Sequence, residues 1–373
     1  MQFLRSTPTT TSSSAGVLLA LYLTLVRLLR YRRRNNILRR YGDSSRRHNR
    51  QAMASMTLDE ASAIQREIAQ LEFPTTFERS LGFAILKTYG IPSISRLLVA
   101  TRQLAEQATV SKRAADTGVI MSEIIYNKPG SPRSVDGIAR MNFLHSRYRR
   151  AGRISDADML YTLSMFALEP VRWIARFEWR PLSDVEMCAM GVYWRDMGEV
   201  MGIPYDALEE YMHLGDDESH DDGLAWLDAL DAWSREYETK YMVPAETNKK
   251  LGWRTLELVV MNTPRLLRSF SLKVAISSLE PRLRTALMID EPSPLHFTVF
   301  YTMDIVRRWA LRYLILPRPG WARRRMFTDE PDPQTGKYHR TTYITHPCPG
   351  GRGFEVRAGG IRHPGARSGC VEG

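Results

Sequence analysis

Hydrophobic positions recur at helical spacing through most of the chain, from about residue 51 to residue 317. Apolar residues three or four positions apart fall on one face of an α-helix, whereas strands alternate every second residue. The clearest set is Met187, Met190, Tyr193, Trp194 and Met197. No alternating run is flanked by Asn-Gly or Asp-Gly, the pairs that mark hairpin turns. The pattern predicts an all-α fold with a single large helical domain.

Polar residues mark where several of these helices begin. A hydroxyl residue followed three positions later by glutamate forms a capping box, which satisfies free backbone N–H groups. This spacing occurs at Thr57 with Glu60, Thr75 with Glu78, and Ser183 with Glu186. Inside the strongest helix, over residues 160–179, Pro170 removes one hydrogen bond and is expected to kink the helix.

An apolar segment, AGVLLALYLTLVRLL, covers residues 15–29. As a helix it is ~22 Å long, shorter than the ~30 Å core of a bilayer. Arg27 lies inside it, but a long arginine side chain can snorkel to the interface. No A-x-A-like cleavage site follows the segment. We therefore expect a membrane anchor over residues 15–31, with an amphipathic or transit-type leader as the alternative.

The predicted organisation has five parts. A disordered N-terminus covers residues 1–14, the anchor residues 15–31 and a basic linker residues 32–54. The helical domain covers residues 55–320, and an irregular tail covers residues 321–373, which turn Gly/Arg-rich beyond Pro347. Nine arginines lie between residues 30 and 50. The positive-inside rule therefore predicts a single-pass protein with its helical domain in the cytosol.

The net charge of +11 is confined to the two ends of the chain. Residues 1–50 contribute +10 and residues 318–373 contribute +5, which leaves 11 − 10 − 5 = −4 for the central body. A nucleic-acid-binding domain carries its basic charge on the folded body, so no nucleic acid partner is expected. A basic run beside an apolar segment instead favours membrane lipid as a partner.

Sequence motifs exclude several enzyme classes. The chain has no GxGxxG, P-loop, HExxH or GxSxG motif, and its three cysteines form no CxxC pair. Rossmann dehydrogenases, P-loop NTPases, zincins and α/β-hydrolases are therefore disfavoured. An enzyme built from helices alone would use the chemistry of a cofactor held among them.

The first candidate site is the segment KRAADT at residues 112–117. On a helix, Arg113, Asp116 and Thr117 share one face. These residues either form a solvated ion pair beside a threonine or place donors at the edge of a cofactor or substrate pocket. The spacing alone leaves both readings open.

The second candidate is His145, in the segment RMNFLHSRY at residues 140–148. It lies beside an apolar stripe made of Met141, Leu144 and Tyr148. Such a histidine is either a hydrogen-bonded residue at the edge of the core or an axial haem ligand, for which imidazole is a usual choice. A ligand would also need an acceptor for its other ring nitrogen.

The third candidate is an acidic cluster, HLGDDESHDD at residues 213–222. Carboxylates and imidazoles suit a hard or borderline metal ion, but the glycine and glutamate placement of an EF-hand is missing. The alternative is a solvated loop between helices. We expect an exposed, dispensable loop for its five central members, His213, Asp216, Asp217, His220 and Asp221.

Several stretches, taken in order, resemble one known family. They are RMNFLHSRY at residues 140–148, GRISDADMLYTLSMFALEPVRWI at 152–174, FEWRPLSDVE at 177–186 and YWRDMGEVMGI at 193–203. Upstream, KRAADT resembles the Arg-x-x-x-Thr motif of that family. The family comprises haem-dependent oxygenases, among them the fungal ER-bound MpaB enzymes and the bacterial latex-clearing rubber oxygenases. The resemblance covers about residues 70–320.

The resemblance implies a globin-like, haem-binding helical core with haem b as cofactor. By position, His145 would be the axial ligand of the haem iron, and Arg113 and Thr117 would match the haem-pocket motif. Asp116 stands where rubber oxygenases carry a lysine, whereas MpaB-type members resemble this chain at that position. The resemblance makes Arg113, Thr117 and Asp116 the candidate catalytic residues. Four further matches are taken as mainly structural: Trp173, Glu178, Trp179 and Arg180. The C-terminus departs from the family pattern after Pro347.

The resemblance further implies O₂ as co-substrate and an apolar substrate. Known relatives cleave a C=C bond in isoprenoid chains, which predicts an ER membrane enzyme of secondary metabolism acting on an isoprenoid or meroterpenoid-like molecule. Two alternatives remain open at this point. One is a non-catalytic helical membrane adaptor, and the other is a carboxylate/His metal-dependent enzyme that uses the acidic cluster.

Overall fold

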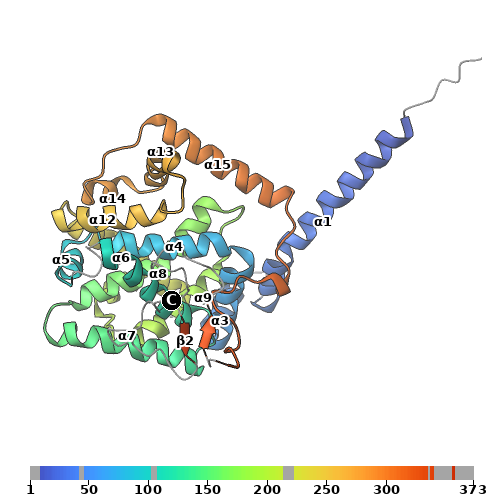
Figure 1. The fold of residues 1–373 in the computed structure, drawn as a ribbon. Helices are drawn as coiled ribbons and strands as arrows, with labels where there is room; N and C mark the ends of the chain where they lie inside the picture. The colour runs from blue at the N-terminus through green and yellow to red at the C-terminus, as the bar shows by residue number, and fades with distance from the viewer. Residues whose placement is uncertain are drawn as a thin grey trace, which may run out of the picture.

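The computed structural model describes residues 9–41, 46–101, 107–212, 222–334, 337–339 and 355–357, and these residues are mostly helical (Figure 1). The first part of the chain forms α1 (Thr9–Tyr41), α2 (Arg46–Ala54), α3 (Leu58–Glu67), the π-helix η1 (Ile68–Glu72), α4 (Pro74–Thr88), α5 (Pro92–Ala100), α6 (Gln107–Ile125) and α7 (Pro132–Arg150). The middle forms α8 (Asp156–Phe177), α9 (Asp184–Val200), the 3₁₀ turn η2 (Asp206–Leu208), α10 (Glu209–Met212) and α11 (Gly223–Tyr241).

The last part forms α12 (Glu246–Val259), α13 (Arg265–Ile276), α14 (Pro281–Ala286), α15 (Pro294–Tyr313) and the 3₁₀ turn η3 (Gly320–Ala322). Two three-residue strands, β1 (Lys337–His339) and β2 (Glu355–Arg357), pair antiparallel within the predicted irregular tail. The prediction of an all-α fold is confirmed, because this short ribbon is the whole of the sheet among the described residues.

Helix α8 lies at the centre of the body and packs against α4, α9 and α11. Its residues Leu160, Tyr161, Met165 and Ala167 are at most 1% exposed. A helix surrounded by others buries side chains on every face, and each large apolar side chain buried there contributes roughly 1.5–3 kcal/mol. One hydrophobic cluster runs from Ile37 to Ile289, so the body is built around a single core.

Helices α9 and α11 approach each other until their backbones touch. A Cβ atom placed on Gly191 would lie 1.8 Å from the carbonyl oxygen of Gly223. A Cβ on Gly223 would lie 2.4 Å from the carbonyl oxygen of Cys188. Only glycine fits at both positions, and the close contact buries the thiol of Cys188 completely.

Two of the three predicted capping boxes are present. Thr57 and Ser183 each begin a helix, with the expected glutamate bonding back to the cap. The predicted capping box at Thr75 is wrong. Helix α4 already begins at Pro74, so Thr75 lies inside the helix and is not its N-cap. Proline suits the first helical position, because its φ is fixed at a helical value and its missing N–H would have no partner there. Helix α8 continues through Pro170 to Phe177.

Helix α1 is longer than the predicted anchor. It begins within the segment expected to be disordered and continues through residues 32–41 of the predicted linker. Residues Ser14–Tyr41 form a helix long and apolar enough to cross a membrane, which confirms the expected N-terminal anchor helix. Figure 1 shows the N-terminal part of α1 projecting away from the body, and Val17, Leu18 and Leu21 are about 60% exposed there.

From Tyr22 onward, α1 is fixed to the body by polar contacts. Tyr22 donates from its hydroxyl to the carbonyl of Leu314 at 2.6 Å. Arg30 and Arg33 donate to the carbonyls of Ile315 and Arg318. Arg33 also pairs with Glu72 at 3.3 Å. The anchor helix and the segment after α15 are therefore held side by side.

The segment FEWR at residues 177–180 joins this anchor region to the core. Trp179 packs edge-on against Tyr31 of α1, with ring centroids 5.1 Å apart. Arg180 pairs with Glu186 at 2.7 Å, and Glu178 pairs with Arg307 of α15 at 2.5 Å. Trp179, Glu178 and Arg180 are all buried.

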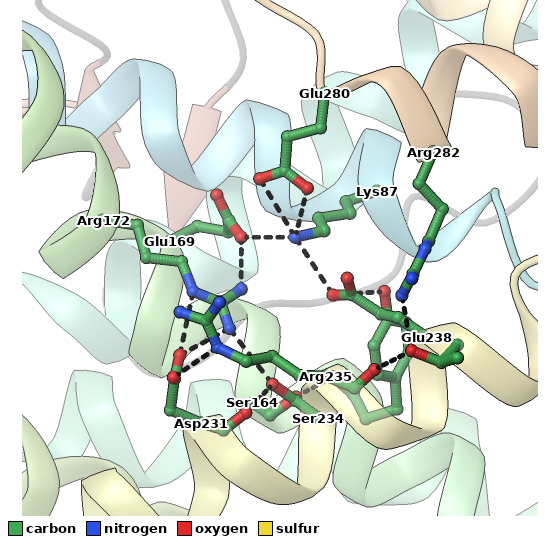
Figure 2. A network of polar contacts seen from close by, with 12 residues as sticks. Lys87, Ser164, Glu169, Arg172, Asp231, Ser234, Arg235, Glu238, Glu280 and Arg282 are labelled. Carbon is green, nitrogen blue, oxygen red and sulfur yellow. Dashed lines mark hydrogen bonds and ion pairs between the residues drawn. The ribbon is translucent and has the colours of Figure 1, made fainter.

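A buried network of charges joins α4, α8, α11 and the start of α14 (Figure 2). Lys87 is 1% exposed, and its Nζ lies 3.1 Å from Glu169, 3.0 Å from Glu238 and 3.1 Å from Glu280. Arg172 continues the network to Glu169 at 2.8 Å and to Asp231 at 2.6 Å. We call these residues the Lys87 network.

Candidate active site

Helices α6 and α7 carry the predicted site residues, and small side chains let them pack closely. A Cβ atom on Gly137 of α7 would lie 3.1 Å from Ile124 Cγ1 of α6. The start of α7 is further fixed by Arg133, which donates from Nε and Nη2 to the buried carboxylate of Glu123 at 2.5 and 2.6 Å. These contacts hold the N-terminal half of α7 against α6.

The C-terminal half of α7 is held by the end of α9. Asn142 donates to the carbonyl of Val200 at 3.0 Å. Arg149 donates to the carbonyls of Met201 at 3.0 Å and Gly202 at 2.9 Å, and it pairs with Asp156 at 2.9 Å. His145 lies between these two clamps, so the backbone that carries it is fixed on both sides.

The imidazole of His145 is held in its neutral form. Burial, together with the nearby positive charges of Arg113 and Arg149, lowers its pKa to about 4. Its Nδ1 atom is buried and has no hydrogen-bond partner among the described residues. A buried polar atom without a partner costs about 1–3 kcal/mol. A neutral ring with an uncommitted nitrogen is the state in which histidine binds a metal.

Arg113 is positioned by its own helix. Its Nη1 donates to the hydroxyl of Thr117 at 2.6 Å, and that hydroxyl donates to the carbonyl of Arg113 at 2.9 Å. The structure therefore brings Arg113 and Thr117 together, as the spacing predicted. It also brings Arg113 close enough to His145 to lower the pKa of the imidazole. Asp116 is partly exposed on the same helix.

Two further residues join this site from other helices. Tyr89 follows α4 and is 3% exposed. Burial raises the pKa of its phenol to about 12, although the charge of Arg113 and a hydrogen bond with Thr255 of α12 oppose the shift. Tyr89 thus adds a neutral phenol within the electrostatic range of Arg113. Tyr89 and Thr255 could not be identified from the sequence, because their contacts join segments far apart in the chain.

A separate open pocket of about 560 Å³ runs along α12. Its lining is mostly charged and includes Glu246, Lys250 and Arg254 around Trp253. His145 does not line this pocket. Charged side chains around an open pocket suit an apolar ligand poorly, so the α12 pocket is not the one expected for a hydrophobic substrate.

Three curated proteins resemble the chain over most of its length, whereas no protein-family model matches it. ER-bound oxygenase mpaB' of Penicillium brevicompactum is 39% identical over 326 residues, which cover 87% of this chain and 75% of that protein. ER-bound oxygenase mpaB of Penicillium roqueforti is 41% identical over 280 residues, or 75% and 91% of the two chains. This chain belongs to the MpaB family of ER-bound oxygenases. A further member, mpaB of Penicillium brevicompactum, is 37% identical over 326 residues, or 87% and 74% of the two chains.

Membership in the MpaB family supports an oxygenase role and association with a membrane. The membrane association agrees with the apolar helix α1. It disfavours the non-catalytic adaptor. The resemblance to bacterial rubber oxygenases stays a prediction, since all three relatives are MpaB proteins.

Residues 213–221 of the acidic cluster, with His213, Asp216, Asp217, His220 and Asp221, lie outside the described residues. Its last member, Asp222, is 2% exposed and therefore is not part of a solvated loop. Asp222 accepts from the backbone of Leu224 and Ala225 at the start of α11, at 3.0 and 2.8 Å, and pairs with Arg50 at 3.0 Å. Within the described part of the chain, no three His, Cys, Asp or Glu side chains form a metal-binding group.

Proposed function

We propose that this MpaB-family member is a membrane-anchored, haem-dependent oxygenase in which His145 is the axial ligand of haem b. The observation that carries the proposal is the state of His145: a half-buried, neutral imidazole whose Nδ1 atom is buried and bound by no described residue. Buried polar atoms are normally hydrogen-bonded, and a bound ligand would supply the partner that the described residues do not. Imidazole is a usual axial ligand of haem iron.

The residues around His145 fit a haem group in charge as well as in donor type. Arg113 supplies a positive charge next to the imidazole, held in place by Thr117. A guanidinium in this position would offer charge-assisted hydrogen bonds to a propionate of the haem, or a donor to the oxygen co-substrate. Arg149 provides a second positive charge near the ring, while its own donors are used by backbone carbonyls and Asp156.

The proposed reaction is oxidative cleavage of a C=C bond in an isoprenoid or other apolar chain. When bound, haem iron supplies the binding and activation of O₂. Conversion of one C=C bond and one O₂ into two carbonyl groups balances without a further reductant. The chain's own residues keep the imidazole unprotonated, hold a cation beside it and exclude water by burial. The oxygenase names of the relatives support this class of reaction.

The proposed location is the ER membrane, with α1 crossing it once. The exposed apolar residues of α1 lie toward its N-terminus, and its arginines lie toward the body. By the positive-inside rule, the catalytic domain is on the cytosolic side. An apolar substrate dissolves in the same bilayer, which places enzyme and substrate together.

The test is purification of the full-length protein in detergent, followed by its absorption spectrum and iron content. We expect a Soret band and one iron per chain in the wild type. His145→Ala should lose the band and the iron while keeping its helical circular dichroism. His296→Ala is the matched control, because His296 is buried but its Nδ1 lies 2.7 Å from Ser293 Oγ. Full haem in His145→Ala would contradict the assignment, as would manganese or zinc in place of iron.

Arg113 can be tested in the same preparation. If it donates to bound oxygen, Arg113→Ala should reduce turnover more than haem content. If it clamps a propionate, both should fall together. Unchanged haem content with unchanged turnover would remove Arg113 from the site.

A further inference from the structure

Helix α15 turns an apolar face outward, whereas a helix on the surface of a soluble protein turns its apolar face toward the core. Ile305 is 58%, Val306 59% and Trp309 55% exposed, and at 100° per residue these three positions fall on one face. Leu295 and Tyr313, at 61% and 39% exposure, lie on the same face. A surface helix normally turns such residues inward, so this face requires a cover.

The side of α15 that faces the body carries its partnered polar residues. Arg307 donates to the carbonyl of Phe177 at 2.9 Å and pairs with Glu178. His296, on that side, is 8% exposed and lies beside Ser293. The orientation of α15 is therefore fixed by specific contacts, and its apolar residues are held outward.

Neighbouring segments extend this apolar surface. Helix α13 packs against α15 and adds Leu266 and Phe270, which are 97% and 38% exposed. The chain after α15 adds Leu316, at 44%, and Trp321, at 83%. We call the exposed apolar residues of α13, α15 and residues 314–321 the α13–α15 face.

We propose that the α13–α15 face is a second membrane contact, lying on the bilayer that α1 enters. Lipid is the expected cover because this face adjoins the anchor helix. Helix α1 is bonded to the chain directly after α15 through Tyr22, Arg30 and Arg33. Figure 1 shows α15 running along one edge of the body toward α1. A bilayer around the exposed apolar part of α1 would therefore meet the adjoining end of α15.

The charges on and around the face also fit a lipid surface. Exposed arginines border it at Arg265, Arg268, Arg318 and Arg323. Arg312 lies within the apolar face of α15, where its long side chain can reach the headgroups. With Asp304, Arg307, Arg308 and Arg312, α15 is too charged to cross the membrane and instead suits a position in the interface plane. Trp309 and Trp321 are typical of that layer.

The test measures lipid contact directly in the full-length protein reconstituted into phosphatidylcholine vesicles with a minority of phosphatidylserine. Cys348→Ser and Cys370→Ser remove two thiols, and the third, Cys188, is fully buried with its pKa raised to about 11. Trp309→Cys then carries an environment-sensitive fluorophore. Phe143→Cys is the matched control, because Phe143 is an aromatic residue 59% exposed on α7, at the opposite edge of the body in Figure 1.

We expect the label at position 309 to show blue-shifted emission and to be quenched by nitroxide attached to lipid acyl chains. The label at position 143 should instead be quenched by aqueous iodide. Equal iodide quenching at both positions would overturn the proposal. A blue shift at position 309 that disappears as the protein is diluted in lipid would also overturn it, because a second copy of the chain would then be the cover. Helical circular dichroism shows that both labelled proteins are folded.

Discussion

The Lys87 network and the His145 site are both polar groups inside an apolar body, but they differ in how their groups are satisfied. Lys87 is within 3.1 Å of three carboxylates, and two of those carboxylates are themselves buried. His145 has a buried nitrogen without a partner and a positive charge nearby. A buried group with every partner present is explained by the fold. One left incomplete at the cost of stability points to a ligand.

The largest effect is expected when the positive charge of Lys87 is removed from the Lys87 network. Lys87→Met leaves Glu169 and Glu238 buried without their counter-ion, and we expect the free energy of unfolding to fall by about 3–5 kcal/mol. Urea denaturation of the protein in detergent measures this change. Arg235→Ala is the control at the edge of the network. Arg235 pairs with Asp231 at 2.6 Å but is 68% exposed, so its loss should change stability by less than about 0.5 kcal/mol. Equal losses would show that burial does not set the energetics here.

The same network predicts a dependence on alkaline pH. Burial alone would lower the pKa of Lys87, but Glu169, Glu238 and Glu280 outweigh it and raise the pKa above its ordinary value of 10.5. Above that pH the unfolded chain loses the proton first, so stability present below pH 10.5 is lost as the pH rises. The contribution of Lys87 has a slope of at most about 1.4 kcal/mol per pH unit. The difference between wild type and Lys87→Met, measured by denaturation across that range, should show this slope; a constant difference would not fit.

Replacing His145 by an apolar residue should change the stability of the protein in the opposite direction. In haem-free protein, His145→Leu replaces an unpaired nitrogen by an apolar group, and we expect stability to rise by about 1 kcal/mol while haem binding is lost. His296→Leu instead removes a satisfied ring and should lower stability by a similar amount, about 1 kcal/mol. Thermal unfolding of the two haem-free variants compares them directly. A loss of stability in both would make His145 an ordinary structural residue.

The smallest effect is expected at the residue that only positions Arg113. Thr117→Val keeps the shape of the side chain but removes the hydroxyl that accepts from Arg113. A single such hydrogen bond contributes about 0.5–1.5 kcal/mol, so turnover should fall by about tenfold at most. Haem content should stay near that of the wild type. Loss of haem from this variant would instead place the hydroxyl in direct contact with the cofactor.

The helical fold could be predicted because periodicity and capping are local properties of the sequence. Thr57 and Ser183 show this, and Pro74 shows that a first-position proline outweighs a nearby capping pattern. The full length of α1 could not be predicted. Its arginine-rich end is helical in contact with carbonyls at residues 315 and 318, which no local pattern reveals.

The residues of the candidate site also divide into those that local spacing reveals and those that only packing brings together. Arg113 and Thr117 could be paired from their helical spacing, and Arg149 follows His145 by one helical turn. Tyr89 and Thr255 could not be found, since they reach Arg113 only through the packing of α4, α6 and α12. The Lys87 network was missed for the same reason: its members lie on helices separated by up to about 190 residues of chain.

The polar clamp between α1 and the chain after α15 has a consequence for how the enzyme meets its substrate. Arg30 and Arg33 hold the body to the base of the anchor without a flexible hinge between them, because α1 is unbroken from Thr9 to Tyr41. A body on a loose tether samples a volume, whereas a clamped body sweeps a thin layer as it diffuses in the plane of the membrane. Encounters with the proposed lipid-dissolved substrate would then occur in two dimensions, at the high effective concentration that such confinement produces.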